Sequence, residues 1–195
     1  MISYESDRCT IYTGDALEII PTIKKSSLDL IVTDPPYGVE FQSNWKDEQF
    51  DKIIGDDSTE IGSRVITEMI KVLRNKRHVY VFGPFEEAIE EVENLQTPVQ
   101  IIWDKGSCGM GDLTSAWGPQ WEPIFFSSKH SKSDIEQGRG RVTARLRKGN
   151  IIHCPRKSQS KYRHPTEKPV NLLRTLIETS SLVDETVFDP FAGSG

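Results

Sequence analysis

The chain has 195 residues, of which 36% are hydrophobic and 27% are charged, and its formal net charge is −5. This composition excludes a disordered or fibrous protein and is typical of a single soluble globular domain. No apolar run approaches the roughly 20 residues of a membrane span, and Glu5 and Asp7 stand where a signal peptide would be basic and then apolar. We therefore expect a cytoplasmic protein with no membrane contact.

The predicted secondary structure alternates between short β-branched runs and helical patterns, which is typical of βαβ units and a mostly parallel sheet. In chain order, strands are predicted over residues 9–13, 28–33, 78–82, 99–103, 123–127 and 186–189. Helices are predicted over residues 16–23, 62–75, 85–95 and 169–181. Residues 38–60 and 104–120 are polar or glycine-rich without periodicity, so we expect two long loops there.

The three cysteines, Cys9, Cys108 and Cys154, stand at unrelated spacings. They form neither a disulfide framework nor a paired CxxC motif, and His153 beside Cys154 has no partner at ligand spacing, so no metal site is expected. Because free cysteines are usually buried in folded proteins, we expect buried, reduced thiols.

The first chemically distinctive segment, Asp34-Pro35-Pro36-Tyr37-Gly38, directly follows the apolar run of residues 30–32. In an open α/β sheet this is the carboxyl end of a strand, where ligands bind. The Asp34 carboxylate and a neighbouring carbonyl can accept the two N–H protons of a planar amino group, while the prolines stiffen the backbone and remove competing donors. Tyr37 offers a flat face for a nucleobase flipped out of a duplex. An ordinary strand-ending turn is the alternative interpretation of this segment on its own.

A basic segment lies between residues 139 and 163, where nine residues are Lys or Arg and none is Asp or Glu, while the rest of the chain is strongly acidic. A solvated surface normally mixes both signs, so this segment favours binding to a polyanion, whose phosphates release counterions when Lys or Arg neutralises them. The basic residues are Arg139, Arg141, Arg145, Arg147, Lys148, Arg156, Lys157, Lys161 and Arg163.

Two further motifs lie near the C-terminus. Thr166 can cap the helix expected to begin at Pro169, and the N–H groups at such a helix start suit an anion such as a carboxylate, although capping alone explains these residues. Residues 188–195 follow a predicted strand, and the glycines at 193 and 195 let the backbone approach a ligand closely. A phosphate-binding P-loop is disfavoured because no Gly-Lys-Ser or Gly-Lys-Thr sequence follows.

In this order and spacing, the motifs resemble those of the S-adenosylmethionine-dependent DNA amino-methyltransferases, the adenine-N6 and cytosine-N4 enzymes whose catalytic motif precedes the cofactor glycine motif. The catalytic motif corresponds to residues 29–38, the helix start to residues 164–169 and the glycine motif to residues 188–195. Residues 13–17 look like the family's strand-end Gly-Asp, and weaker landmarks are similar at residues 79–82, 103–105 and 122–123.

The resemblance implies an α/β fold with the Rossmann-like sheet of S-adenosylmethionine-dependent methyltransferases. It implies one catalytic domain over residues 1–195, with a basic target-recognition insert at about residues 129–163. Family members continue past the position of Gly195 through a helix and another strand that complete the cofactor site. On this ground we expect a sheet that is incomplete at the C-terminus and weak or no binding of S-adenosylmethionine by the 195-residue chain.

The resemblance also assigns roles to individual residues. The catalytic residues are Asp34, Pro35, Pro36 and Tyr37. The cofactor-binding residues are Asp15, Thr166, Glu167, Lys168, Asp189, Phe191, Gly193 and Gly195. The nine basic residues between positions 139 and 163 bind duplex DNA, and no metal takes part.

The reaction that the resemblance implies is transfer of a methyl group from S-adenosylmethionine to the N6 amine of adenine in duplex DNA, as in restriction-modification systems. Asp rather than Ser before Pro-Pro-Tyr favours adenine over cytosine. Cytosine-N4 methylation, methylation of RNA or of a protein glutamine amide, and a catalytically inactive, methyltransferase-like DNA-binding protein remain open. Because relatives are often dimers, a homodimer is open as well.

Overall fold

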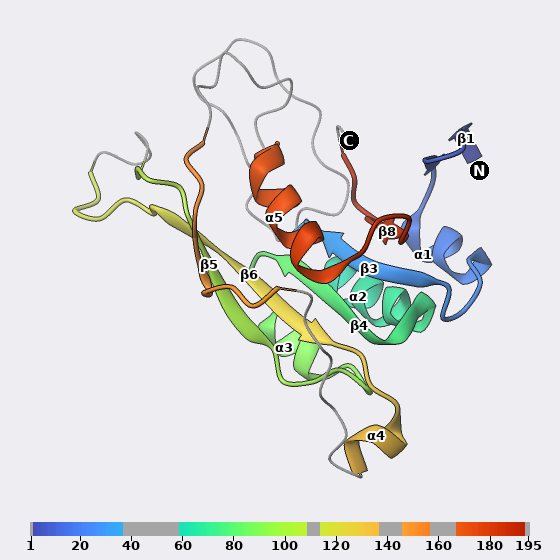
Figure 1. Ribbon diagram of the computed structural model, residues 1–195. Helices are drawn as coiled ribbons and strands as arrows, with labels where there is room; N and C mark the ends of the chain where they lie inside the picture. Colours follow the sequence, from blue (N-terminus) through green and yellow to red (C-terminus); the bar gives the residue numbers. More distant parts are fainter. Residues whose placement is uncertain (1, 37–58, 109–113, 137–145, 157–166, 194–195) are drawn as a thin grey trace.

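The computed structural model describes residues 2–36, 59–108, 114–136, 146–156 and 167–193. In this part of the chain, six strands form one sheet in the order β7-β5-β6-β4-β3-β8, and two more form a separate hairpin (Figure 1). The strands of the sheet are β3 (Leu28–Thr33), β4 (Leu73–Phe82), β5 (Val99–Asp104), β6 (Trp121–Ser128), β7 (Ile151–His153) and β8 (Val187–Phe188). The hairpin consists of β1 (Ile2–Glu5) and β2 (Thr10–Tyr12).

The sheet is mostly parallel, as predicted, because β3, β4, β5, β7 and β8 run in one direction and β6 alone among its described strands runs the opposite way. β3 pairs in parallel with β4 and β8, and β5 pairs in parallel with β7, but β6 runs antiparallel to both β4 and β5. Parallel neighbours need a long crossover connection, usually a helix. The described residues between β5 and β6 contain no helix, and β6 runs back beside β5 in the opposite direction.

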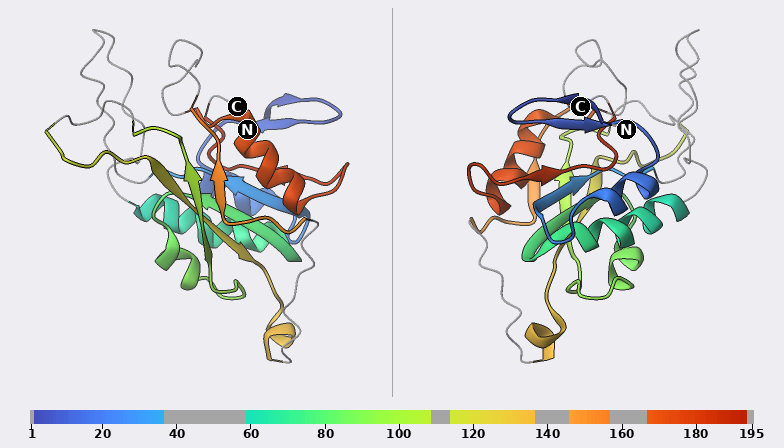
Figure 2. Two further views of the ribbon diagram at one scale, coloured as in Figure 1. Left: turned by 60° about the vertical axis from the view of Figure 1, so that its left-hand side comes forward. Right: turned by 90° about the vertical axis from the view of Figure 1, so that its right-hand side faces the viewer.

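Helices cover both faces of the sheet (Figures 1 and 2). On one face lie α1 (Ala16–Ile19) with its 3-10 continuation η1 (Ile20–Thr22), α2 (Glu60–Val72) and α3 (Glu86–Glu90), and on the other lies α5 (Val170–Ser180). Along β3, Ile31 joins the core beneath α2, whereas Leu30 and Val32 join the core beneath α5. A strand buried on both faces has a continuous apolar sequence, which is the pattern that predicted β3.

α2 and β4 meet without a loop. The sequence pattern predicts a helix to residue 75 and a strand from residue 78, but α2 ends at Val72 and β4 begins at Leu73. The Lys129 ammonium donates to the carbonyl oxygens of Ile70 and Leu73, at 2.6 Å each. It thereby satisfies carbonyls that a longer helix would have paired, and the chain is free to enter the sheet early. The sequence did not predict the short elements β1, β7 and α4 (Lys132–Glu136).

The cysteines lie nearer to the surface than expected. Cys9 and Cys108 are exposed and Cys154 is partly exposed, so the prediction of buried thiols was wrong, while all three are free as predicted. Cys9 precedes β2 in a hairpin whose strand residues are all exposed, and Cys108 follows β5 in a connection at the surface. Neither segment packs a face against the core, so neither can bury a thiol.

A buried carboxylate joins three parts of the sheet. Asp29 on β3 pairs with Arg74 and, at 3.2 Å, with Arg77, both on β4. Its second oxygen accepts the N–H of Thr186, just before β8, at 3.1 Å. Asp29 is only 3% exposed, so these contacts replace the water that its charge loses on folding. They also fix β8 beside β3.

A buried polar cluster lies between β4 and the end of α5. The Ser180 hydroxyl oxygen is 2.7 Å from His78 Nδ1 and 2.6 Å from the Tyr80 hydroxyl oxygen. All three residues are buried. Burial, together with the nearby charges of Arg77 and His130, lowers the pKa of His78 to about 4.

We predict that this cluster makes the fold less stable in acid. The unfolded chain takes up the His78 proton near the ordinary pKa of 6.5, whereas the folded chain takes it up only near pH 4, so stability is lost as the pH falls through this window. The loss from His78 amounts to about 3 kcal/mol by pH 4. In urea unfolding, His78→Gln should flatten the fall in unfolding free energy towards pH 4, while the exposed His153→Gln should retain it. An unchanged pH dependence in His78→Gln would contradict this prediction.

Candidate active site

The ends of β3 and β8 lie side by side because the two strands pair in parallel. β3 is followed by Asp34, and β8 is followed by Asp189. The Thr33 hydroxyl donates to Asp189 Oδ1 at 2.6 Å, and the Phe191 N–H donates to the same oxygen at 2.9 Å. Burial raises the pKa of Asp189, and these two hydrogen bonds oppose the rise. The fold thus joins two of the predicted motifs, through residues 156 positions apart in the sequence.

Asp34 has one oxygen in an ion pair and one without a partner. Oδ2 pairs with the Lys168 ammonium, which comes from the segment before α5. Oδ1 is buried and has no hydrogen-bond partner among the described residues. Pro35 and Pro36 follow and have no backbone N–H to donate. Burial raises the pKa of Asp34, the charge and hydrogen bond of Lys168 oppose the rise, and the Glu122 carboxylate adds to it.

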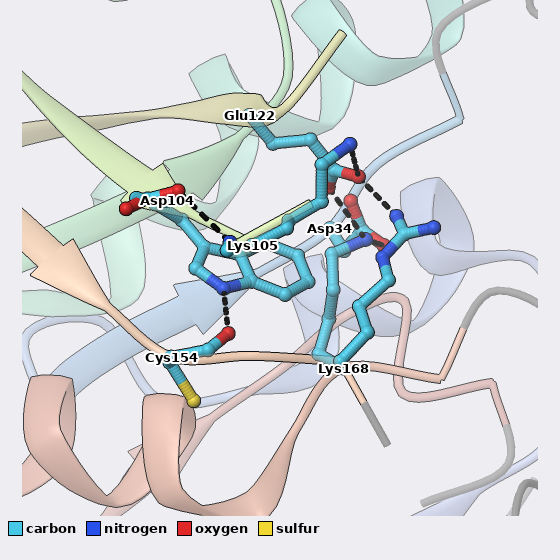
Figure 3. A network of polar contacts seen from close by, with 9 residues as sticks. Asp34, Asp104, Lys105, Glu122, Cys154 and Lys168 are labelled. Atoms are coloured by element: carbon cyan, nitrogen blue, oxygen red, sulfur yellow. Dashed lines mark hydrogen bonds and ion pairs between the residues drawn. The ribbon is translucent and has the colours of Figure 1, made fainter. Parts of the chain in front are cut away.

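A row of alternating charges extends from Asp34 (Figure 3). The Lys168 ammonium, paired with Asp34, also lies 3.9 Å from Glu122 Oε2 on β6. Glu122 Oε1 lies 3.4 Å from Lys105 Nζ, after β5, and pairs with Arg156, after β7. Four strands and the segment before α5 therefore bring two carboxylates and three cations together.

Aromatic rings lie against two of these cations. Lys168 Nζ is 5.2 Å from the centre of the Phe82 ring, and Arg156 Cζ is 5.5 Å from the centre of a ring of Trp103. Both aromatic side chains are buried, and Trp103 Nε1 donates to the Cys154 carbonyl at 2.7 Å. A cation over an aromatic face is attracted to its electrons. Ring faces and carboxylates together hold Lys168 and Arg156 in place.

Three of the residues predicted to bind a cofactor have a visible role in the structure. Gly193 and Asp15 shape the backbone near them, and Lys168 pairs with a residue that was predicted to be catalytic. Gly193 has a φ of +59°, which favours glycine, and a Cβ there would lie 3.9 Å from its nearest neighbour. Asp15 caps α1, its Oδ1 accepting the Leu17 N–H at 2.8 Å. Lys168 contacts Asp34, a residue predicted to be catalytic, so the two predicted sets meet at this ion pair.

Some of the other residues that were predicted to bind the cofactor or DNA lie in the part of the chain that the structure describes, and the rest lie outside it. Glu167 lies beside Lys168, and Arg147 and Lys148 are exposed in the segment before β7. Arg156, predicted to bind DNA, pairs with Glu122. The predictions that lie outside the described residues concern Tyr37, Thr166, Gly195, Arg139, Arg141, Arg145, Lys157, Lys161 and Arg163.

Two absences apply to the described part of the chain. It contains no group of three or more His, Cys, Asp or Glu side chains that could hold a metal ion. None of its helices combines the length and the apolar sequence needed to cross a membrane.

Glu122 and Lys105 had no predicted role, because they lie only within the weaker landmarks at residues 122–123 and 103–105. Lys105 directly follows β5 and Glu122 is the second residue of β6. Since β5 and β6 are antiparallel neighbours, the end of one lies beside the start of the other. A charged residue of opposite sign at each of these positions is the signal that could have indicated the pair.

Comparison with known proteins identifies the family. A family model described as DNA methylase matches residues 28–195. DNA adenine methyltransferase YhdJ of Escherichia coli (strain K12) is 28% identical over 95% of this chain and 71% of its own length. Putative methylase YubD of the same strain is 30% identical over 93% of this chain and 74% of its own length. Type II methyltransferase M.HpaI of Haemophilus parainfluenzae is 24% identical over 93% of this chain and 63% of its own length.

Solved structures share the fold. The M1.HpyAVI–SAM complex has a TM-score of 0.62 at 20% identity and covers 94% of this chain and 83% of its own. PvuII DNA methyltransferase (cytosine-N4-specific) has a TM-score of 0.64 at 16% identity and covers 96% of this chain and 76% of its own. The predicted α/β fold with a Rossmann-like methyltransferase sheet is therefore confirmed. With a family match over residues 28–195, the chain belongs to the DNA methylase family of N6 and N4 amino-methyltransferases.

Proposed function

We propose that this DNA methylase transfers a methyl group from S-adenosylmethionine to the N6 amine of adenine in duplex DNA. The observation that carries the proposal is Asp34 Oδ1, a buried acceptor that no described residue pairs with. A buried acceptor without a partner costs stability, and an N–H of a bound ligand would recover that cost. Adenine is favoured by the Asp before Pro-Pro and by the likeness to DNA adenine methyltransferase YhdJ.

In this proposal Asp34 acts on the amino group of the target base. Oδ1 accepts one N–H and a nearby backbone carbonyl accepts the other, which localises the lone pair on the nitrogen. Pro35 and Pro36 set the position of these acceptors before the base arrives. The amine nitrogen would form an N–C bond as the C–S bond of the methyl donor breaks and a neutral thioether leaves, and the methylated amine would then release a proton to solvent. The Asp34 charge would stabilise the positive charge that develops on the nitrogen. S-adenosylmethionine, when bound, supplies a methyl group activated by its sulfonium.

The residues proposed to hold S-adenosylmethionine fit such a ligand. Gly193 leaves its backbone open to close approach. Pro169 is the N-cap of α5, and no described side chain caps the N–H groups there, which suits the carboxylate of the ligand. We assign Lys168 a role beside Asp34 and not in cofactor binding, because its ammonium pairs with the Asp34 carboxylate. The proposed cofactor residues are Asp15, Thr166, Glu167, Asp189, Phe191, Gly193 and Gly195.

The DNA-binding part of the proposal rests on charge and exposure. We assign the chain to one catalytic domain in which residues 129–163 contact DNA. Arg147 and Lys148 are exposed and adjacent, so both can reach phosphates. Arg156 is held by Glu122, which makes it the basic residue of this segment least suited to a phosphate contact in the described structure.

We predict that the double change Arg147→Glu and Lys148→Glu weakens DNA binding and flattens its dependence on salt. Each lost phosphate contact should reduce the slope of log K against log salt by roughly one. Fluorescence anisotropy titrations over a range of salt concentrations measure this slope. The control is Lys24→Glu with Lys25→Glu, an exposed basic pair before β3, which should leave the slope unchanged. The same slope in both double variants would remove the segment from DNA binding.

The reaction is tested by incubating the protein with duplex DNA and methyl-tritiated S-adenosylmethionine, followed by nucleoside chromatography. Label in N6-methyldeoxyadenosine supports the proposal. Label in N4-methyldeoxycytidine would replace adenine by cytosine as the target. Transfer to RNA or to a protein glutamine would move the reaction to another substrate. Binding of DNA without transfer would indicate an inactive, methyltransferase-like DNA-binding protein.

A further inference from the structure

Among the described residues, Glu122 is the carboxylate that contacts all three cations beside the proposed active site. Its Oε2 lies 3.9 Å from Lys168 Nζ, its Oε1 lies 3.4 Å from Lys105 Nζ, and Arg156 pairs with that same oxygen. The side chains of Lys105 and Lys168 are only 10% and 11% exposed, so water screens their charges poorly. Lys168 therefore lies between two carboxylates, those of Asp34 and Glu122.

Asp34 needs one oxygen free of cations for the proposed reaction. Positive charge develops on the target nitrogen as the N–C bond forms, and an ammonium group beside the accepting oxygen opposes that charge. An ammonium group at this oxygen would also occupy the position of the target amine. In the structure Lys168 pairs with Oδ2 only, while Oδ1 is left without a partner in the described part of the chain. Glu122, whose Oε2 lies 3.9 Å from the ammonium, is the second carboxylate beside Lys168.

Resting on the proposed function, we propose that Glu122 is a positioning residue for methyl transfer and acts through Lys168. Its carboxylate holds the Lys168 ammonium on the Oδ2 side of Asp34 and offsets its charge, so that Oδ1 stays open to the target amine. Lys105 and Arg156 fix the Glu122 carboxylate in turn. Glu122 touches neither the amine nor the cofactor in this proposal and is not a catalytic residue.

The pKa of Asp34 reports this arrangement. Among the residues that the structure describes, the charged groups that act on Asp34 are Lys168, Glu122 and Asp189. Glu122 raises the pKa of Asp34 directly, as a like charge. In this proposal it also raises that pKa indirectly, because it keeps Lys168 from approaching Oδ1. Glu122→Gln removes both effects. In a Lys168→Met background only the direct effect is left to remove, so a double-mutant cycle separates the two.

The test is this cycle, measured by NMR titration of protein labelled with 13C-aspartate, without DNA or cofactor, with Asp34→Asn to assign the signal. We expect Glu122→Gln to lower the pKa of Asp34 by on the order of one unit, and by less than half as much when Lys168 is also Met. Equal shifts in both backgrounds, or no shift in either, would overturn the proposal. The matched control is Glu93→Gln, at an exposed glutamate paired with Lys132, which should leave the Asp34 titration unchanged.

Kinetics give a second readout. We expect Glu122→Gln to lower kcat about tenfold with KM for DNA within about threefold, and Glu122→Gln with Lys168→Met to be more active than Glu122→Gln alone, because no ammonium is left to cover Oδ1. A double variant no more active than Glu122→Gln counts against the proposal. If Glu122→Gln does not fold, Glu122→Asp keeps the charge, shortens its reach and enters the same cycle. If the unmodified protein transfers no methyl group, the proposed function fails, while the NMR cycle still decides whether Glu122 controls Lys168.

Discussion

Replacing Asp34 by asparagine is expected to reduce methyl transfer by at least about 10³-fold while DNA binding stays within a few fold. Asparagine has nearly the same shape, but it removes the negative charge and can turn an NH₂ donor towards the target amine. The developing charge on the amine nitrogen then has no anion beside it. The rate is measured as tritiated methyl transfer to duplex DNA, and binding is measured by anisotropy in parallel.

The control for this change is Asp184→Asn. Asp184 is exposed and has a φ of +67°, a conformation that asparagine also tolerates, so this variant should keep full activity. Asp34→Ala should be as inactive as Asp34→Asn, because both lack the acceptor charge. Turnover within tenfold of the unmodified protein in either Asp34 variant would remove Asp34 from the mechanism.

Replacing Asp29 by alanine is expected to lower the free energy of unfolding by about 3–5 kcal/mol, enough to unfold much of the protein near body temperature. The change leaves Arg74 and Arg77 beside a site that has lost its anion and leaves the Thr186 N–H without its acceptor. Urea unfolding followed by circular dichroism measures the loss. Because Asp29 also fixes β8 beside β3, the variant should lose methyl transfer faster than secondary structure on warming.

Asp7→Ala is the matched control for this stability measurement. Asp7 is exposed in the β1–β2 hairpin, and surface changes of this kind usually alter the unfolding free energy by less than about 0.5 kcal/mol. A loss at Asp29 no larger than that at Asp7 would show that the buried ion pairs do not hold β3, β4 and the start of β8 together.

The elements that were predicted most accurately are those whose own pattern of apolar residues indicates which faces are buried. β3 lies at residues 28–33 as predicted, because each of its residues is buried on one face or the other. α5 agrees within a residue at each end, since its apolar positions follow the helical period. The extension of β4 to Leu73 could not be predicted, because it depends on Lys129, which closes the end of α2 from a distant part of the chain.

The candidate site was predicted in part for a similar reason. Asp34 and Asp189 follow strands that the sequence indicates, so their position at the edge of the sheet could be predicted from local pattern. The residues that contact Asp34 and Asp189 could not be predicted in this way. Lys168 meets Asp34 across 134 positions in the sequence, and its second contact, Glu122, comes from a strand whose antiparallel direction was not predicted.

The hydrogen bond from Thr33 to Asp189 joins the proposed base-binding and cofactor-binding segments directly. Thr33 is the residue before Asp34, and Asp189 begins the turn that leads to Gly193. If these segments bind ligands as proposed, we expect a ligand that moves either segment to act on the other, so that occupancy of one subsite changes the affinity of the second. Thermodynamic linkage requires the effect to be reciprocal: whatever factor the methyl donor contributes to the affinity for the target base, the base returns to the affinity for the donor. We therefore expect such a protein to select its two substrates jointly, and we expect the loss of the Thr33 hydroxyl to weaken this cooperativity.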